Sequence, residues 1–184
     1  MPDATAVIDD MSFETPQAIG GGRWRLLTDQ VMGGVSEGSL DRDVVGGRLA
    51  LRLRGEVSLE NNGGFVQMAL DLSPDGAAVD AGRWCGVELD VFGDGHTYNV
   101  HLRTDALTRP WQSYRQSFTA PAEWRTVRLP FDGFVAHRTD VPFDPRRLRR
   151  IGVVAIGAAT AFDLAIGGLR FMMASPPAFD ASTG

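Results

Sequence analysis

Several residue types are scarce in this sequence, and each scarcity excludes a class of protein. The single cysteine, Cys85, has no partner for an internal disulfide, and we interpret it as a buried structural thiol because an apolar-alternating stretch follows it. No apolar run approaches the ~20 residues that a membrane-spanning helix needs. The three histidines show neither metal-ligand spacing nor a pairing with serine or cysteine in a nucleophile motif. The sequence thus predicts no membrane span, no metal site, no cofactor and no catalytic triad.

Lysine is absent, and the balance of charge is acidic. All 18 basic residues are arginine, 23 residues are acidic, and the net charge is -5. Because a general nucleic-acid-binding protein normally has a basic excess, we expect no nucleic-acid partner. Residues 1–10 contain neither the basic nor the apolar segment of a signal peptide. Together with the lone cysteine, this predicts a cytoplasmic protein in a reducing compartment.

Alternation of apolar and polar residues dominates the pattern of the chain. A period of two residues is typical of a strand with one face in a hydrophobic core. The alternation predicts strands over residues 48–55, 87–91, 98–103, 113–118, 124–129, 149–156 and 162–171.

Glycine and proline separate these runs at short intervals, which indicates an all-β protein built as an antiparallel sandwich or barrel. Helix should be confined to short turns near residues 145–148 and 76–82. We predict a single β-sandwich domain over residues 1–173 and a flexible C-terminal tail over residues 174–184, where two prolines and small polar residues gather.

Two strings with paired glycines interrupt the alternation. Residues 29–36 read Asp-Gln-Val-Met-Gly-Gly-Val-Ser, and residues 58–65 read Ser-Leu-Glu-Asn-Asn-Gly-Gly-Phe. Paired glycines permit a positive φ, and short polar side chains stand beside each pair. Such strings suit loops that bring the backbone close to another strand or to a ligand.

The two strings belong to a longer ordered pattern that runs from residue 13 to residue 171. Trp24 precedes the first string. The pattern continues with Gly93-Asp94-Gly95-x-x-Tyr98, Leu102-Arg103-Thr104-Asp105, Ser113-Tyr114-Arg115-x-x-Phe118, Trp124-x-x-Val127-x-Leu129-Pro130-Phe131 and Ile151-Gly152. In this order the motifs resemble the complex I intermediate-associated protein 30 family.

The resemblance implies both a fold and a role. The fold would be a galactose-binding-like jelly-roll β-sandwich, in agreement with the alternation. The family's mitochondrial member assists assembly of the respiratory NADH:ubiquinone oxidoreductase, and related modules in photosynthetic organisms are joined to dinucleotide-binding domains. This sequence shows no Arg- and Ser-rich transit segment and reads as a bare domain.

Arg103 is the first candidate for a binding residue. It shares one face of its predicted strand with Asn99 and His101, and its guanidinium suits carboxylate, phosphate or sugar hydroxyl partners. A structural ion pair with Asp105 or Asp29 is the alternative role.

Further candidates complete a polar patch around Arg103. Asp29 and Asn62 would supply acceptors unless they only cap turns, and Tyr114 and Gln116 share a face of the next predicted strand. Trp111 follows a proline in a loop and is a candidate contact residue. The predicted ligand- or partner-binding residues are therefore Asp29, Asn62, Arg103, Trp111, Tyr114 and Gln116.

We interpret the remaining tryptophans, a glycine-rich segment and a basic cluster mainly as structural features. Trp24, Trp84 and Trp124 each adjoin a strand and are expected in the core. Gly93-Asp94-Gly95 is typical of a hairpin turn. The basic cluster over residues 146–150 is either a solvated turn or a patch for an acidic partner or membrane headgroups.

We therefore predict a non-catalytic, chaperone-like binding module that contacts another protein, such as a respiratory-complex subunit or an assembly intermediate. The alternative is a module that binds a carbohydrate or small polar ligand on the concave face of the sandwich. An enzyme would need two groups with perturbed pKa in a cleft. Asp29 with Asp105 or Glu60 is the carboxylate set available, and these residues are as readily capping groups.

Overall fold

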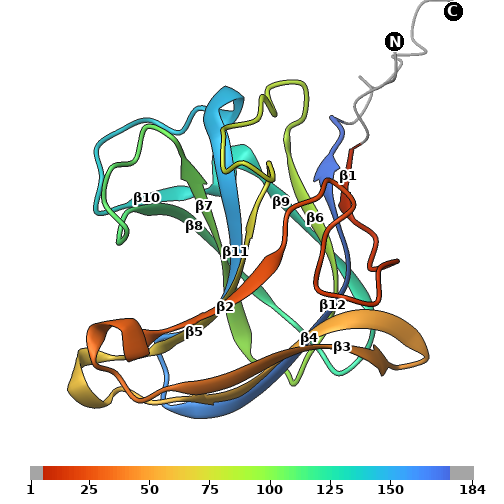
Figure 1. Ribbon diagram of the computed structural model, residues 1–184, viewed down its shortest axis with the longest axis vertical. Helices are drawn as coiled ribbons and strands as arrows, with labels where there is room; N and C mark the ends of the chain where they lie inside the picture. Colours follow the sequence, from red (N-terminus) through yellow and green to blue (C-terminus); the bar gives the residue numbers. More distant parts are fainter. Residues whose placement is uncertain (1–5, 175–184) are drawn as a thin grey trace, which may run out of the picture.

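The computed structural model describes residues 6–174, which form two antiparallel sheets packed face to face (Figure 1). One sheet has the strand order β3-β4-β12-β6-β9, with β1 paired to β12, and we call it the ion-pair sheet. The other has the order β10-β8-β7-β11-β5-β2, and we call it the curved sheet. The predicted all-β jelly-roll sandwich is confirmed. The predicted tail, from residue 175 onward, lies outside the described residues.

The ion-pair sheet consists of β1 (Val7–Asp9), β3 (Glu37–Val45), β4 (Arg48–Val57), β6 (Gly86–Phe92), β9 (Arg125–Pro130) and β12 (Thr160–Met172). The curved sheet consists of β2 (Trp24–Thr28), β5 (Phe65–Asp71), β7 (Thr97–Thr104), β8 (Ser113–Thr119), β10 (Val135–His137) and β11 (Leu148–Ile156). In Figure 1 this sheet bends so that β10 and β8 lie above and β5 and β2 below, with the outer side of β7 and β11 between them.

Helix within residues 6–174 is limited to 3-10 turns. These are η1 (Asp29–Met32), η2 (Glu60–Asn62), η3 (Phe131–Gly133) and η4 (Pro145–Arg147). None of them has the length or the apolar character to cross a membrane. The turn predicted near residues 145–148 is confirmed, whereas a helix at 76–82 is wrong, because Val79 pairs with Leu148 as an isolated bridge there.

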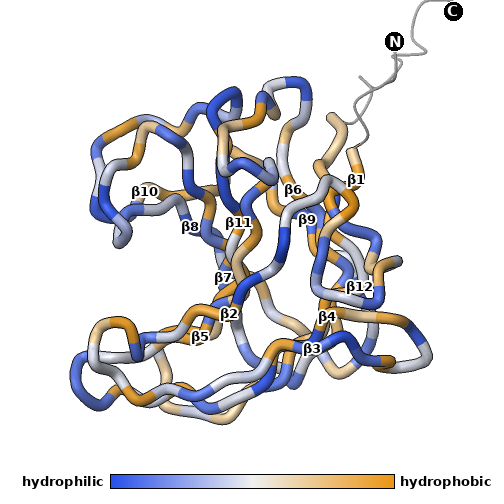
Figure 2. The backbone as a smooth tube through the Cα atoms, viewed as in Figure 1, coloured by the Kyte–Doolittle hydropathy of each residue, from blue (hydrophilic) through white to orange (hydrophobic). Residues whose placement is uncertain are grey.

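One hydrophobic core fills the space between the sheets. Its side chains alternate along the strands, so that Leu51 and Leu53 of β4 and Val100 and Leu102 of β7 are all fully buried in it. Figure 2 shows hydrophobic residues recurring along the strands where the two sheets meet. Burial of this alternating set is what fixes the register of each strand, since a slip of one residue would turn it outward.

The three tryptophans expected in the core are partly or wholly covered. Trp24 is buried and donates its Nε1–H to the buried carboxylate of Asp9 at 2.8 Å. Trp84 stacks on Phe171 with ring centroids 4.3 Å apart. Trp124 is half-buried, and its Nε1–H donates to the carbonyl of Val45 at the end of β3.

The segment Gly93-Asp94-Gly95 is a crossover between sheets and not the predicted hairpin turn. It leaves β6 in the ion-pair sheet and enters β7 in the curved sheet. The Asp94 carboxylate accepts hydrogen bonds from the Tyr98 hydroxyl at 2.7 Å and from the amide of Asp163 on β12 at 2.9 Å. One side chain thus ties both sheets at this corner.

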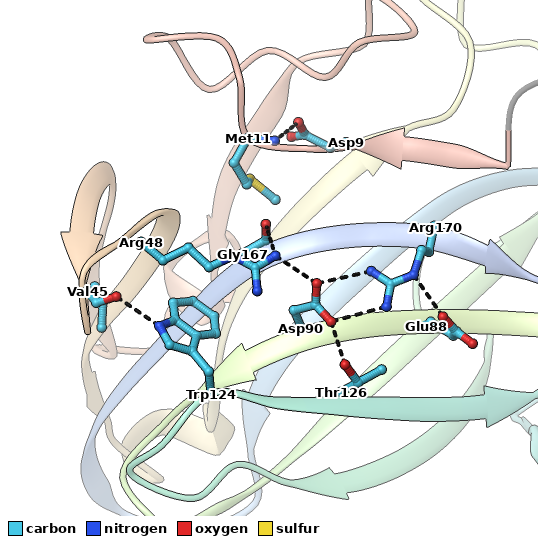
Figure 3. A network of polar contacts seen from close by, with 10 residues as sticks. All are labelled: Asp9, Met11, Val45, Arg48, Glu88, Asp90, Trp124, Thr126, Gly167 and Arg170. Carbon is cyan, nitrogen blue, oxygen red and sulfur yellow. Dashed lines mark hydrogen bonds and ion pairs between the residues drawn. The ribbon is translucent and has the colours of Figure 1, made fainter.

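The outer side of the ion-pair sheet is a network centred on Asp90 (Figure 3). Its carboxylate accepts hydrogen bonds from Arg48 at 2.8 Å, from two nitrogens of Arg170 at 3.0 and 3.1 Å, and from the Thr126 hydroxyl at 2.7 Å. Arg170 also donates to Glu88 at 2.7 Å. Burial opposes ionisation of Asp90, but these donors outweigh it and hold its pKa well below the usual range.

Replacing Asp90 with asparagine removes the charge that faces Arg48 and Arg170. We expect Asp90→Asn to lower the free energy of unfolding at pH 7 by about 2 kcal/mol, because one partner of a mostly buried pair is lost while the half-exposed arginines stay partly screened by water. Urea unfolding followed by tryptophan fluorescence measures the difference.

The matched control is Asp43→Asn on β3 of the same sheet. Asp43 accepts a hydrogen bond from Arg52, which keeps a second carboxylate, Asp163, when Asp43 is neutralised. This variant should unfold close to the wild type. Equal effects of Asp90→Asn and Asp43→Asn would contradict a central role for the Asp90 network.

Candidate functional site

The two glycine-doublet strings fold against each other around the carboxylate of Asp29. This residue opens η1 and is fully buried. Its carboxylate accepts hydrogen bonds from the amide and hydroxyl of Ser36 and from the amides of Gly64 and Phe65 in the second string. Ser36 Oγ in turn accepts a hydrogen bond from the amide of Ser58 at 2.9 Å. We call these five residues the Asp29 hub.

Glycines are required where the backbone presses on this carboxylate. A Cβ added to Gly34 would lie 2.4 Å from Asp29 Cγ, and one added to Gly63 would lie 2.5 Å from Oδ2. Gly33 ends η1 with a φ of 87°, a left-handed conformation that glycine adopts without steric conflict. The strings do bring backbone close to another group, and that group is a buried side chain of the same chain.

The Asp29 carboxylate is ionised and sealed. Burial alone would raise its pKa, but the hydrogen bonds from Ser36, Gly64 and Phe65 outweigh burial and hold the pKa below its ordinary value. Its accepting oxygens are engaged by the hub. The turn-capping role therefore describes the position of Asp29, and the expectation that it lies beside Arg103 is wrong.

The distance between the two residues follows from the strand register. Asp29 continues from Thr28 at the end of β2, which pairs through β5 with Ala155 on β11. Arg103 on β7 pairs with Arg150, which also lies on β11. Five residues of β11 separate these positions, or about 17 Å along the sheet. Asn62 stays with the hub, where it is exposed at the end of η2 with a φ of 59°.

The hub loops carry apolar side chains on their outer surface. Val31 is 78% exposed and Met32 66% exposed at the end of η1, while Val35 and Leu59 are also exposed. Val35 precedes Ser36 and Leu59 follows Ser58, and these two serines are hydrogen-bonded to each other. We call Val31, Met32, Val35 and Leu59 the apolar tip.

Arg103 lies on the outer, concave side of the curved sheet together with Asn99 and His101, as the alternation predicted. Its Nη1 lies 2.8 to 3.0 Å from the carbonyl oxygens of Arg109, Pro110 and Gln112. The guanidinium thus supports the loop between β7 and β8. The alternative ion pairs with Asp105 or Asp29 are not formed, since Asp105 pairs with Arg147.

Trp111 lies at the tip of that loop and is 53% exposed, with the guanidinium of Arg109 over its ring at 5.9 Å from the centroid. Arg103 and Trp111 are therefore brought to the same loop. Whether either residue contacts a ligand stays a prediction.

Tyr114 and Gln116 point toward the sandwich interior and not toward Arg103. The register pairs Tyr114 with Leu102 and Gln116 with Val100, whose side chains are in the core. The Tyr114 ring packs against Phe143 with centroids 5.0 Å apart, and its hydroxyl donates to the carbonyl of Val141. Paired residues of an antiparallel ladder share a face, so Tyr114 and Gln116 follow their inward partners.

Arg115 is the β8 residue that shares the concave face with His101, and the sequence reasoning missed it. Burial, followed by Arg115 and His137, lowers the pKa of His101 to about 3, so the imidazole is neutral at physiological pH. Its Nε2 is buried without a hydrogen-bond partner among the described residues. The neighbouring Gly152 makes room for Gln67, because a Cβ there would lie 2.2 Å from the Gln67 amide nitrogen.

Charge is segregated between the two sheets. The strands of the ion-pair sheet contain eight carboxylates and seven arginines, many of them paired. The strands of the curved sheet contain five arginines and one carboxylate, Asp71, which pairs with Arg25 and Arg150. In a chain of net charge -5, the concave face is therefore locally basic.

Residues 6–174 contain no group of three or more His, Cys, Asp or Glu side chains placed to hold a metal ion.

Solved structures with this fold include carbohydrate-binding modules. A family 11 module from Clostridium thermocellum, in complex with a β-1,3-1,4-mixed-linked tetrasaccharide, aligns over 92% of this chain and 95% of that one with a TM-score of 0.71 and 13% identity. A family 30 module aligns over 96% and 93% with a TM-score of 0.64 and 16% identity. An exo-β-agarase aligns over 94% of this chain and 26% of its own, with a TM-score of 0.62 and 11% identity. These likenesses show the class of fold, a jelly-roll β-sandwich.

The family is defined by the sequence. The model of the complex I intermediate-associated protein 30 family matches residues 11–166. This range covers most of the chain, so the protein belongs to that family, and the resemblance is confirmed. None of the curated proteins matches the sequence.

Neutralising Asp29 should loosen both hub loops at once. We expect Asp29→Asn to lower the free energy of unfolding at pH 7 by about 3 kcal/mol. The buried donors of the hub would lose a charged acceptor, and the new amide NH₂ would face donors with which it cannot form a hydrogen bond. Since the folded-state pKa of Asp29 is depressed, its contribution is complete above the unfolded pKa of about 4 and is lost as the pH falls through the folded value. Denaturant unfolding at pH 7 and pH 3 measures both effects.

The control is Asp75→Asn, an exposed aspartate that caps a turn through Ser73 and Ala77. It should unfold near the wild type at neutral pH. If the difference in free energy of unfolding between the wild type and Asp29→Asn were larger at pH 3 than at pH 7, the hub assignment would be refuted.

Proposed function

We propose that this protein is a non-catalytic binding module that assists the assembly of a protein complex, with the respiratory NADH:ubiquinone oxidoreductase as the first candidate. Membership of the complex I intermediate-associated protein 30 family supports the proposal. The observation that carries it is the apolar tip, an exposed set of Val, Met and Leu side chains on loops that a buried carboxylate holds in place.

The construction of the tip suits a contact with another protein. Large apolar side chains exposed together on one surface are typical of interaction sites, and methionine adapts to varied partners. The Asp29 hub removes flexibility from both loops before any partner binds, which reduces the entropy lost on association. The side chains Val31 and Met32 contribute little to the fold, because most of their surface is in water.

The double variant Val31→Asp/Met32→Asp tests this proposal. We expect the wild-type chain to comigrate with a subunit of the NADH:ubiquinone oxidoreductase on native gels of detergent-solubilised membranes from the organism that encodes it. The double variant should lose most of that comigration, because two charges would have to be buried at the contact.

Val44→Asp is the matched control, since Val44 is 60% exposed on β3, outside the hub loops. It should comigrate like the wild type. No comigration of the wild type with any subcomplex, or equal comigration of all three chains, would defeat the proposal.

A second candidate function is recognition of a carbohydrate on the concave face. It is favoured by the solved family 11 module, which holds a mixed-linked tetrasaccharide on the same fold. The face offers the polar side chains of Asn99 and Gln67, and the exposed Trp111 ring stands beside it. Aromatic rings with nearby polar groups are the usual means of holding sugars.

Calorimetric titration with a β-1,3-1,4-mixed-linked tetrasaccharide tests the second candidate. If the concave face binds the sugar, Trp111→Ala should weaken the affinity by about tenfold, the loss of one stacking contact. Leu49→Ala, at an exposed position on β4, should bind like the wild type. Absence of heat with the wild type, or equal affinity of Trp111→Ala, would remove this candidate.

A further inference from the structure

A small pocket opens at the basic end of the curved sheet. It has a volume of about 100 Å³ and is lined by Arg103, Pro110, Arg149 and Arg150. Arg103 of β7 pairs with Arg150 of β11, and Arg149 lies at the register irregularity between Leu148 and Arg150. No carboxylate is among the lining residues.

The donors around this pocket exceed the acceptors that the described residues provide. Arg103 uses Nη1 for loop carbonyls, and its Nε and Nη2 have no hydrogen-bond partner within residues 6–174. Arg149 Nε is buried and also unpartnered in that part of the chain. Arg150 donates through Nε to Asp71 at 2.8 Å, and Asp71 is shared with Arg25.

The convergence of these guanidinium groups is electrostatically unfavourable without a counter-charge. Burial, and then repulsion from Arg150 and Arg149, lowers the pKa of Arg103. An arginine nevertheless stays protonated at neutral pH, so the repulsion persists in the free protein. The planar donor groups of arginine match the oxygens of a phosphate or carboxylate, and two or more together form strong charge-assisted hydrogen bonds.

We infer that the pocket between Arg103, Arg149 and Arg150 is a binding site for a compact oxyanion, a phosphate or a carboxylate group of a ligand. The volume suits such a group, and the Arg103 nitrogens that have no partner would gain an acceptor beside the charges of Arg149 and Arg150. This site lies at the opposite end of the sheet from the apolar tip, so it does not depend on the proposed partner contact.

Inorganic phosphate is the probe for the test. We expect phosphate to raise the melting temperature of the wild-type chain relative to chloride at equal ionic strength, because it binds the folded state only. Isothermal titration calorimetry then gives the affinity. Arg149→Gln should weaken phosphate binding by about tenfold, the effect of one lost charge-assisted contact.

Arg54→Gln is the control, because Arg54 is exposed on β4 of the other sheet. It should bind phosphate like the wild type. Arg149 is the primary variant because Arg103→Gln would also release the loop that carries Trp111. Arg150→Gln, which leaves Asp71 paired with Arg25, is a second pocket variant for the phosphate titration.

Acetate in place of phosphate separates the two sources of oxyanion. Tighter binding of phosphate would assign a phosphorylated ligand, and tighter binding of acetate a carboxylate ligand; either order supports the site. Equal melting temperatures in phosphate, acetate and chloride, or equal phosphate affinity of Arg149→Gln and the wild type, would overturn it. Neither result bears on the native-gel test of the apolar tip.

Discussion

The buried carboxylate of Asp29 is the interaction on which both glycine-doublet loops depend. It joins a turn that follows β2 to a turn that precedes β5. The carboxylate accepts four hydrogen bonds, which leave the two turns little freedom to rearrange. The glycines around it are consequences of the same contact, since a side chain at Gly34 or Gly63 would displace the carboxylate. A set of residues that reads as a binding motif is thus first a device for folding two loops together.

The division of charge between the sheets gives the molecule two unlike surfaces. On the ion-pair sheet, Asp90 and its arginines neutralise one another, and this surface needs no ligand to balance it (Figure 3). On the curved sheet, Asp71 alone among the strand residues opposes the arginines. The excess of unpaired donors there points to recognition on the concave side, whereas the apolar tip points to recognition by the hub loops. The arginine pocket and the apolar tip lie toward opposite ends of the curved sheet.

Alternation identified the strands that place one face in the core, and it failed where that condition does not hold. β5 buries three successive residues from Met68 to Leu70, and β3 has polar residues on both faces although Leu40 packs against the core, so neither shows a clean period of two. The same limit explains the error at Tyr114. Alternation tells which residues share a face, but the ladder to β7 decides that this face is inward. Contacts between distant segments, such as Asp29 with Gly64, leave no local pattern that predicts them.

Hydrogen–deuterium exchange of individual backbone amides measures how firmly the Asp29 carboxylate holds the two loops. If the Asp29 carboxylate holds the two loops, the amides of Ser36 and Gly64 should exchange as slowly as those of the core strand β11, although both residues lie in loops. Exchange of these two amides at the rate of the exposed loop around Trp111, with β11 still protected, would show that the hub does not hold the loops and would contradict the account.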